Sequence, residues 1–157
     1  MAFVPLGNRA SPEAAWAPIE AAKPQVAMPT AVTAIKPAES AQASSHFRAA
    51  LTFETDCWDV HDALAQGADF VLLDVRSPEL YARGHVPGAI NIPQRKLIES
   101  RLAEYAADTI FVVYCAGPHC NGGHKSAVRL AQLGRPVKLM IGGITGWLDE
   151  GFELAKG

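Results

Sequence analysis

Cys115 and Cys120 stand five positions apart in a glycine-containing stretch of the sequence. Cysteine reacts as the thiolate, and a helix N-terminus or a neighbouring cation lowers the pKa of its thiol from about 8.5 to roughly 3.5–7.5. Cys120 is followed by Gly122 and Gly123, which allow backbone N–H groups to turn inward, and by Lys125, which supplies a positive charge. These residue types at this spacing predict a nucleophilic thiol at Cys120 beside an anion-binding loop.

The sequence on either side of Cys120 predicts the elements that position it. Residues 110–114 are a short apolar run typical of a buried strand, and residues 126–134 have a helical pattern that ends at a glycine. In a strand–loop–helix unit the loop N–H groups and the free donors of the first helical turn converge, which favours an anion there. A lone cysteine is often buried and inert, but this setting favours catalysis. The predicted loop comprises Asn121, Gly122, Gly123, His124 and Lys125.

Three stretches of the sequence resemble segments of the rhodanese-type sulfurtransferases. Cys120-Asn-Gly-Gly-His-Lys-Ser126 is similar to the active-site loop of that family. Residues 73–93 resemble its upstream hallmark segment, and residues 142–152 are similar to its C-terminal segment. The three matches follow one another in the family's order and cover roughly residues 50 to 154, so the chain is identified as a single rhodanese-like unit.

The resemblance implies an enzyme that moves a sulfane sulfur from a donor such as thiosulfate to a thiophilic acceptor, cyanide or a thiol. The sulfur would pass through a persulfide on the loop cysteine, with no metal or organic cofactor. The implied partners are a small-molecule donor and acceptor, with a sulfur-accepting protein as a further candidate. A non-catalytic binding or regulatory module is the alternative, because rhodanese-like domains also serve in that way; the cysteine in the loop argues against it.

The sequence departs from the family pattern at two points. In most members the nucleophile directly follows the strand, a position held here by Cys115, and residues 116–119 are inserted before Cys120. Lys125 stands five positions after Cys120, the spacing that the family loop requires, so we predict Cys120 as the nucleophile. Cys115 is a supporting candidate, a resolving partner for a reversible disulfide. The second departure is Asn121, where the classical enzymes often carry a basic residue, and this leaves the donor open.

Two further chemistries fit parts of this stretch. His119 and Cys120 resemble the start of the cysteine phosphatase signature, but the arginine of that signature would stand at position 126, which is Ser126. Without a bidentate arginine a phosphate transition state loses its main partner. A zinc site is the other alternative, built from Cys115 and Cys120 with His119 or His124. All of these ligands would come from one crowded loop, unlike the usual arrangement of ligand pairs.

Size and composition predict one ordinary domain without a charge-driven partner. The chain has 157 residues, of which 49% are hydrophobic, and a formal net charge of −2, so we expect no nucleic-acid partner. No apolar stretch approaches the roughly 20 residues of a membrane span, and the first ten residues lack the features of a signal peptide. We therefore expect a cytoplasmic protein. Three cysteines suit a reducing compartment better than a disulfide framework.

Alternating strand and helix patterns predict the α/β class, with an open parallel five-stranded sheet that carries helices on both faces. The expected strands are residues 51–54, 70–74, 89–92, 110–114 and 136–141; the expected helices start at the Asp56 cap and at residues 77, 94, 126 and 145. The helix from residue 94 is expected to continue to residue 107. Sites in such folds lie at the carboxyl ends of the strands, where Asp74 and Arg76 are predicted to tie strand and loop together.

The N-terminal third of the sequence differs from the rest. Residues 1–48 are rich in alanine and proline and hold six of the eleven prolines, a spacing that interrupts any long helix. We expect this part to be a mostly disordered extension and residues 49–157 to be the rhodanese-like domain.

Overall fold

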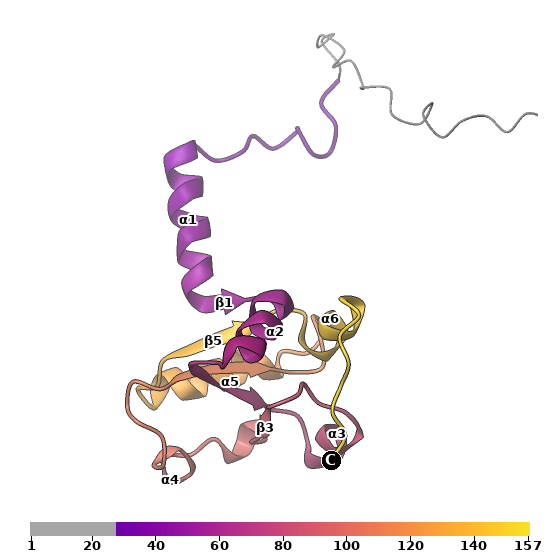
Figure 1. The fold of residues 1–157 in the computed structure, drawn as a ribbon. Coiled ribbons are helices and arrows are strands. Elements are labelled where there is room, and N and C mark those ends of the chain that lie inside the picture. Colours follow the sequence, from indigo (N-terminus) through magenta and orange to yellow (C-terminus); the bar gives the residue numbers. More distant parts are fainter. Residues whose placement is uncertain (1–27) are drawn as a thin grey trace, which may run out of the picture. The chain divides into compact units, whose positions relative to one another are not determined.

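The computed structural model describes residues 28–157, and its centre is a five-stranded parallel sheet (Figure 1). The strand order is β1-β5-β4-β2-β3, and each neighbouring pair is parallel. The strands are β1 (Glu54–Thr55), β2 (Phe70–Asp74), β3 (Ile90–Asn91), β4 (Ile110–Tyr114) and β5 (Val137–Met140). The predicted fold class is confirmed, and strands β2 and β4 have the predicted bounds.

Two helices, those that start at Cys57 and Pro78, begin where the capping residues predict. Asp56 accepts a hydrogen bond from the backbone N–H of Asp59 at 2.8 Å, and Ser77 caps the next helix, which has a proline in its first turn. The helical segments are α1 (Ser40–Phe53), α2 (Cys57–Gln66), α3 (Pro78–Arg83), η2 (Gln94–Lys96), α4 (Glu99–Leu102), α5 (Gly122–Gln132) and α6 (Gly143–Asp149). No helix among residues 28–157 has both the length and the hydropathy needed to cross a bilayer.

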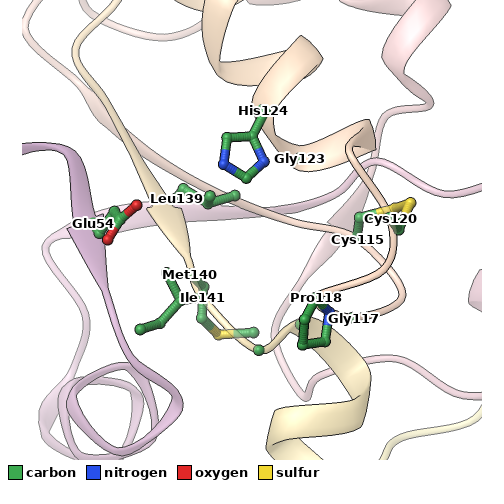
Figure 2. Close-up of a pocket in the computed structure, with 12 residues that line it drawn as sticks. Glu54, Cys115, Gly117, Pro118, Cys120, Gly123, His124, Leu139, Met140 and Ile141 are labelled. Atoms are coloured by element: carbon green, nitrogen blue, oxygen red, sulfur yellow. A yellow bond between two sulfur atoms is a disulfide. The ribbon is translucent and has the colours of Figure 1, made fainter. Parts of the chain in front are cut away.

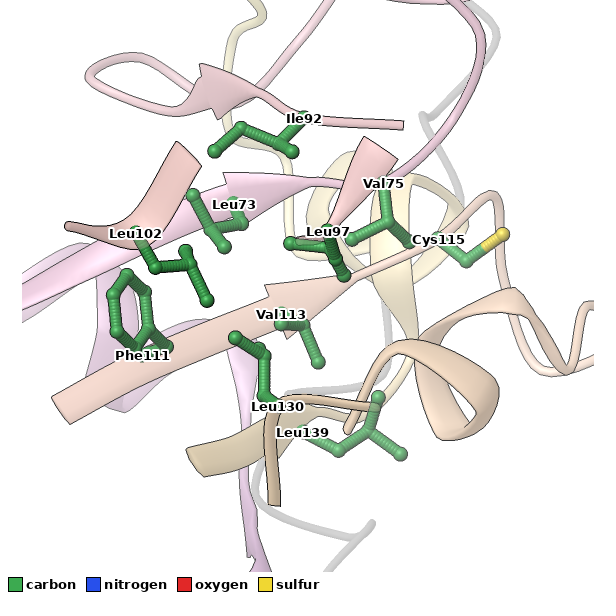
Figure 3. Close-up of a cluster of buried hydrophobic side chains, with 10 residues drawn as sticks. All are labelled: Leu73, Val75, Ile92, Leu97, Leu102, Phe111, Val113, Cys115, Leu130 and Leu139. Carbon is green, nitrogen blue, oxygen red and sulfur yellow. The ribbon is translucent and has the colours of Figure 1, made fainter. Parts of the chain in front are cut away.

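Helices cover both faces of the sheet, because successive side chains of a strand point to opposite sides. On one face Leu73, Phe111 and Val113 pack against Leu97, which follows η2, and against Leu102 of α4 and Leu130 of α5. Figure 3 shows this cluster, with Cys115 at its edge. On the other face, α2 and α6 cover the sheet; the buried residues there include Val60, Leu72, Val112, Tyr114 and Trp147.

Helix α1 occupies residues that the sequence pattern assigned to a strand. The predicted strand at residues 51–54 is wrong for residues 51–53, which complete α1, and β1 contains only Glu54 and Thr55. Alanine is frequent in α1 and has the highest helix propensity, which outweighs the β preference of the last apolar residues. The proposed boundary between residues 48 and 49 falls within this helix, and residues 39–157 form one compact unit.

The continuous helix predicted for residues 94–107 is also wrong. The structure has η2, then two extended residues, Leu97 and Ile98, and then the short helix α4. Leu97 is fully buried, and its carbonyl accepts a hydrogen bond from the guanidinium of Arg129. Arg135 donates to the carbonyls of Leu102, Tyr105 and Ala106. These two arginines thus bind backbone carbonyls that would accept intrahelical hydrogen bonds in a continuous helix, and the packing of Leu97 outweighs the helical preference of the sequence.

Candidate active site

The candidate site lies between β4, the middle strand of the sheet, and helix α5. Cys115 directly follows β4, and α5 begins at Gly122, four residues before the predicted start at Ser126. The two glycines therefore form the first helical turn rather than the preceding loop. Close packing favours glycine at both positions: a Cβ would lie 2.8 Å from the Cys115 sulfur at Gly122, and 2.6 Å from a Leu139 methyl at Gly123.

The first turn of α5 presents free backbone donors at this point. Lys125 makes the first intrahelical bond, from its N–H to the carbonyl of Asn121 at 3.0 Å. The N–H groups of Gly122, Gly123 and His124 precede that bond, and a helix leaves such donors without an intrahelical partner. Together with the helix dipole they favour a negative charge beside the cysteines.

The structure joins Cys115 and Cys120 in a disulfide, with their Cα atoms 6.3 Å apart. Cys115, given above as a candidate partner for a reversible disulfide with Cys120, makes that pairing in this structure. Cys115 is buried, with 9% of its surface exposed, whereas Cys120 is only partly buried. Of the two thiols that reduction would release, Cys120 is the one more open to reactants.

The disulfide forms one wall of a pocket of about 220 Å³. Figure 2 shows the cysteine pair on one side of the pocket and Glu54, from β1, on the other. Most of the remaining lining is apolar or glycine: Gly117, Pro118, Gly123, His124, Leu139, Met140, Ile141, Gly142 and Gly143. Cys120 also lines a second hollow together with His119, Asn121 and His124, which Cys115 does not reach.

Lys125 lies outside this pocket. It lines a separate hollow with Gln94, Val128 and Arg129, on another part of α5. The structure therefore brings Cys115, Gly123 and His124 together around Cys120 and leaves Lys125 out of both hollows that Cys120 borders.

Asp74 and Arg76 form a saturated ionic network at the end of β2. The Arg76 guanidinium contacts the Asp74 carboxylate at 2.5 Å and donates to the carbonyl of Gly84 at 2.7 Å. Asp74 is fully buried and also accepts from the Tyr114 hydroxyl at 2.8 Å. Burial alone would lower the pKa of Arg76, but the hydrogen bond and charge of Asp74 outweigh it and raise that pKa. This network fixes the strand ends, and neither residue lines the two hollows beside Cys120.

Sequence reasoning missed the polar role of Tyr114, which it counted as an apolar strand residue. Besides donating to Asp74, its hydroxyl accepts from the backbone N–H of Val86 at 3.1 Å. Burial, followed by the charge of Asp74, raises the pKa of Tyr114. A tyrosine at the last position of a buried strand, with a carboxylate ending another strand, is the signal that could have revealed this contact.

The start of α6 also supports the site, and sequence reasoning missed it. The N–H groups of Ile144 and Thr145 donate to the carbonyls of Cys115 and Ala116 at 3.1 and 2.9 Å. Gly143 has φ +56°, and a Cβ there would overlap the carbonyl oxygen of Cys115. The double glycine at positions 142 and 143 was the available signal for this close approach.

Cys57 and His85 lie in environments typical of structural rather than catalytic residues. Burial, then the charges of Asp56 and Glu150, raises the pKa of Cys57 to about 11, which keeps its thiol protonated at neutral pH. The ring of His85 stacks on Tyr81 with centroids 3.7 Å apart. Among residues 28–157 no three His, Cys, Asp or Glu side chains are grouped closely enough to hold a metal ion.

Comparison with known proteins identifies the family. Residues 58–150 match the family described as the rhodanese-like domain. The chain belongs to this family. A sulfurtransferase of Allochromatium vinosum is 32% identical over 106 residues, which cover 64% of this chain and 92% of that protein. The family therefore places this rhodanese-like chain in the sulfurtransferase superfamily, and the predicted resemblance is confirmed.

The chain is also similar to part of a longer protein and to solved structures. An HTH-type transcriptional regulator of Mycobacterium tuberculosis is 41% identical over 93 residues, or 59% of this chain, and this chain spans 40% of the regulator's length. Among solved structures, the BH2092 protein of Bacillus halodurans has a TM-score of 0.73 at 36% identity, covering 75% of this chain and 87% of that one. A thiosulfate sulfurtransferase of Pseudomonas aeruginosa has a TM-score of 0.56 at 25% identity, covering 74% and 21%.

Proposed function

We propose that this protein is a sulfurtransferase in which Cys120 carries the transferred sulfur as a persulfide. The observation that supports this most strongly is the position of Cys120, at the N-terminus of α5 and open to a pocket at the carboxyl end of β4. The disulfide must first be reduced to free the thiols. The Cys120 thiolate then attacks the outer sulfur of a sulfane donor, such as thiosulfate, and the rest of the donor leaves.

The persulfide is an anion, and the free N–H groups of Gly122, Gly123 and His124 stabilise it. The apolar lining from Leu139 to Ile141 limits the water around the reacting sulfurs, which strengthens these interactions. Asn121 and His124 border the outer hollow through which a donor or acceptor approaches. A thiophilic acceptor, cyanide in an assay or a thiol, then removes the sulfur from Cys120.

The charges near the pocket affect how strongly it would attract an anionic sulfur donor. Glu54 lines it, whereas Lys125 does not, so a dianion such as thiosulfate meets one negative side chain and only a distant positive one. We keep thiosulfate as the assay donor and propose Lys125 as a residue that attracts anions from a distance. A reducing compartment such as the cytoplasm supplies the thiol state that the reaction needs.

The test follows sulfur uptake by intact mass in variants that separate the two cysteines. After reduction and desalting, Cys115→Ser should gain one sulfur atom from thiosulfate and pass it to cyanide, whereas Cys120→Ser should gain none. Cys57→Ser is the matched control for removing a thiol outside the site. Sulfur uptake by Cys120→Ser but not by Cys115→Ser would assign the nucleophile to Cys115 instead.

A regulatory module is the second candidate, and the similarity to a transcriptional regulator favours it. In that role the same site would bind a ligand or partner without turning it over. Thiosulfate-to-cyanide transfer distinguishes the two, because a binding module would show no repeated turnover in either the wild type or Cys115→Ser.

A further inference from the structure

We propose that Cys115 is a resolving thiol that attacks the Cys120 persulfide and releases its outer sulfur as hydrogen sulfide. The inference rests on the proposed function and names the fate of the sulfur at the same site. The product would be the Cys115–Cys120 disulfide that the structure contains. The reaction would then consume reducing equivalents from a dithiol reductant, so that the protein acts as a sulfane-sulfur reductase.

The geometry places the two sulfurs where this step requires them. Both lie against the first turn of α5: the sulfur of Cys115 is 2.8 Å, and that of Cys120 is 3.4 Å, from the point where a Cβ of Gly122 would stand. Glycine at position 122 leaves that space to the sulfurs, since any side chain would collide with Cys115. The four inserted residues that separate this chain from the family pattern form the connection between the two cysteines.

The two cysteines differ in the way that nucleophile and resolving thiols must differ. Cys120 borders both hollows and therefore meets donors from solvent. Cys115 is 9% exposed and sits at the end of the central strand, where its carbonyl accepts from Ile144. A buried thiol is poorly placed to meet a donor, but it lies next to the Cys120 sulfur. Its attack is intramolecular, which gives it an advantage over dissolved thiols.

The step balances without another reactant. The Cys115 sulfur bonds to the inner sulfur of the persulfide, Sγ of Cys120, and the bond from that Sγ to the outer sulfur breaks. The Cys115 thiol proton leaves with the outer sulfur as HS⁻. The outer sulfur gains two electrons while the two cysteine sulfurs together lose two. A dithiol reductant then restores both thiols and becomes a disulfide itself, with the more exposed Cys120 sulfur as its point of attack.

Single-turnover measurements without added reductant test this inference. Wild-type protein is reduced, desalted and mixed with thiosulfate, and sulfide and free thiols are measured over time. We expect about one sulfide per chain, loss of the two thiols of the pair and retention of the Cys57 thiol. The rate should not depend on protein concentration, because both thiols belong to one chain.

Cys115→Ser is the deciding variant, and it should take up one sulfur, keep it and release no sulfide. Cys115→Ala is made in parallel, because a hydroxyl at this buried position can lack a partner, and thermal unfolding checks that both variants fold. Cys57→Ser should release sulfide as the wild type does. Cyanide should remove the retained sulfur from the Cys115 variants.

The outcomes separate this inference from the proposed function. Wild type that keeps the sulfur and all other thiols, or Cys115 variants that release sulfide at the wild-type rate, would overturn the resolving role while sulfur transfer stands. Absence of sulfur uptake in both the wild type and folded Cys115 variants would instead overturn the proposed function.

Discussion

Two parallel strands at the centre of this sheet end in different chemistry. Strand β2 ends at Asp74 and β4 at Tyr114, and these residues are register partners. After β2 the chain buries an ion pair whose charges and hydrogen bonds are satisfied; after β4 it places two sulfurs beside a pocket. A saturated network has no group left to react, so it holds the backbone, and the two sulfurs lie in the connection after the neighbouring strand. Tyr114 links the two regions through its hydrogen bond to Asp74.

Removing the carboxylate is the strongest way to break this arrangement. Asp74→Ala leaves the Arg76 charge buried without its partner, and such a change costs about 3–5 kcal/mol of folding free energy. Denaturant unfolding measures the loss. Asp149→Ala, an exposed carboxylate in α6, is the control and should change stability by roughly 0.5 kcal/mol or less. A loss for Asp74→Ala similar to that control would show that the network does not hold the strand ends.

A change at Gly143 tests how tightly α6 holds the backbone at Cys115, after β4. Gly143→Ala places a Cβ against the carbonyl of Cys115 at a positive φ, so we expect a loss of about 2–4 kcal/mol together with slower sulfur uptake. Gly134→Ala is the matched control, because its φ is +70° but nothing lies within 4 Å of the added Cβ; it should cost only about 1 kcal/mol. Equal losses in the two variants would mean that the contact with Cys115 contributes nothing.

The smallest effect is expected from the distant charge. Lys125→Met should slow thiosulfate uptake by roughly two- to threefold at low salt and by less at about 1 M salt, because dissolved ions screen the charge of an exposed side chain. The rate of sulfur uptake is measured by quenching the reaction at a series of times and recording the intact mass, at several salt concentrations. Lys156→Met, near the C-terminus, serves as the control for net charge. A tenfold or larger loss that persists at high salt would place Lys125 in direct contact with the donor.

Local sequence patterns predicted the centre of the fold and most of the site. Both ends of β2 and β4 were predicted correctly, because a short apolar run with clear ends is typical of a buried strand. The start of α5 was missed, since two consecutive glycines are typical of a loop and only the crowding by Cys115 and Leu139 explains them inside a helix. Glu54 could not be predicted as part of the pocket wall, because it comes from an edge strand far away in sequence.

The position of the disulfide within a single connection affects the unfolded chain as well as the folded one. A crosslink stabilises a protein mainly by removing conformational entropy from its unfolded state, and the gain grows with the length of the ring that it closes. A ring that spans residues 115–120 corresponds to roughly 2 kcal/mol, compared with about 4.7 kcal/mol for a ring of 100 residues. The reduced form should therefore unfold roughly 5–10 °C below the oxidised form. Opening this short ring costs less than half as much folding free energy as opening a ring of 100 residues, so the proposed reduced form keeps more of the stability of the fold.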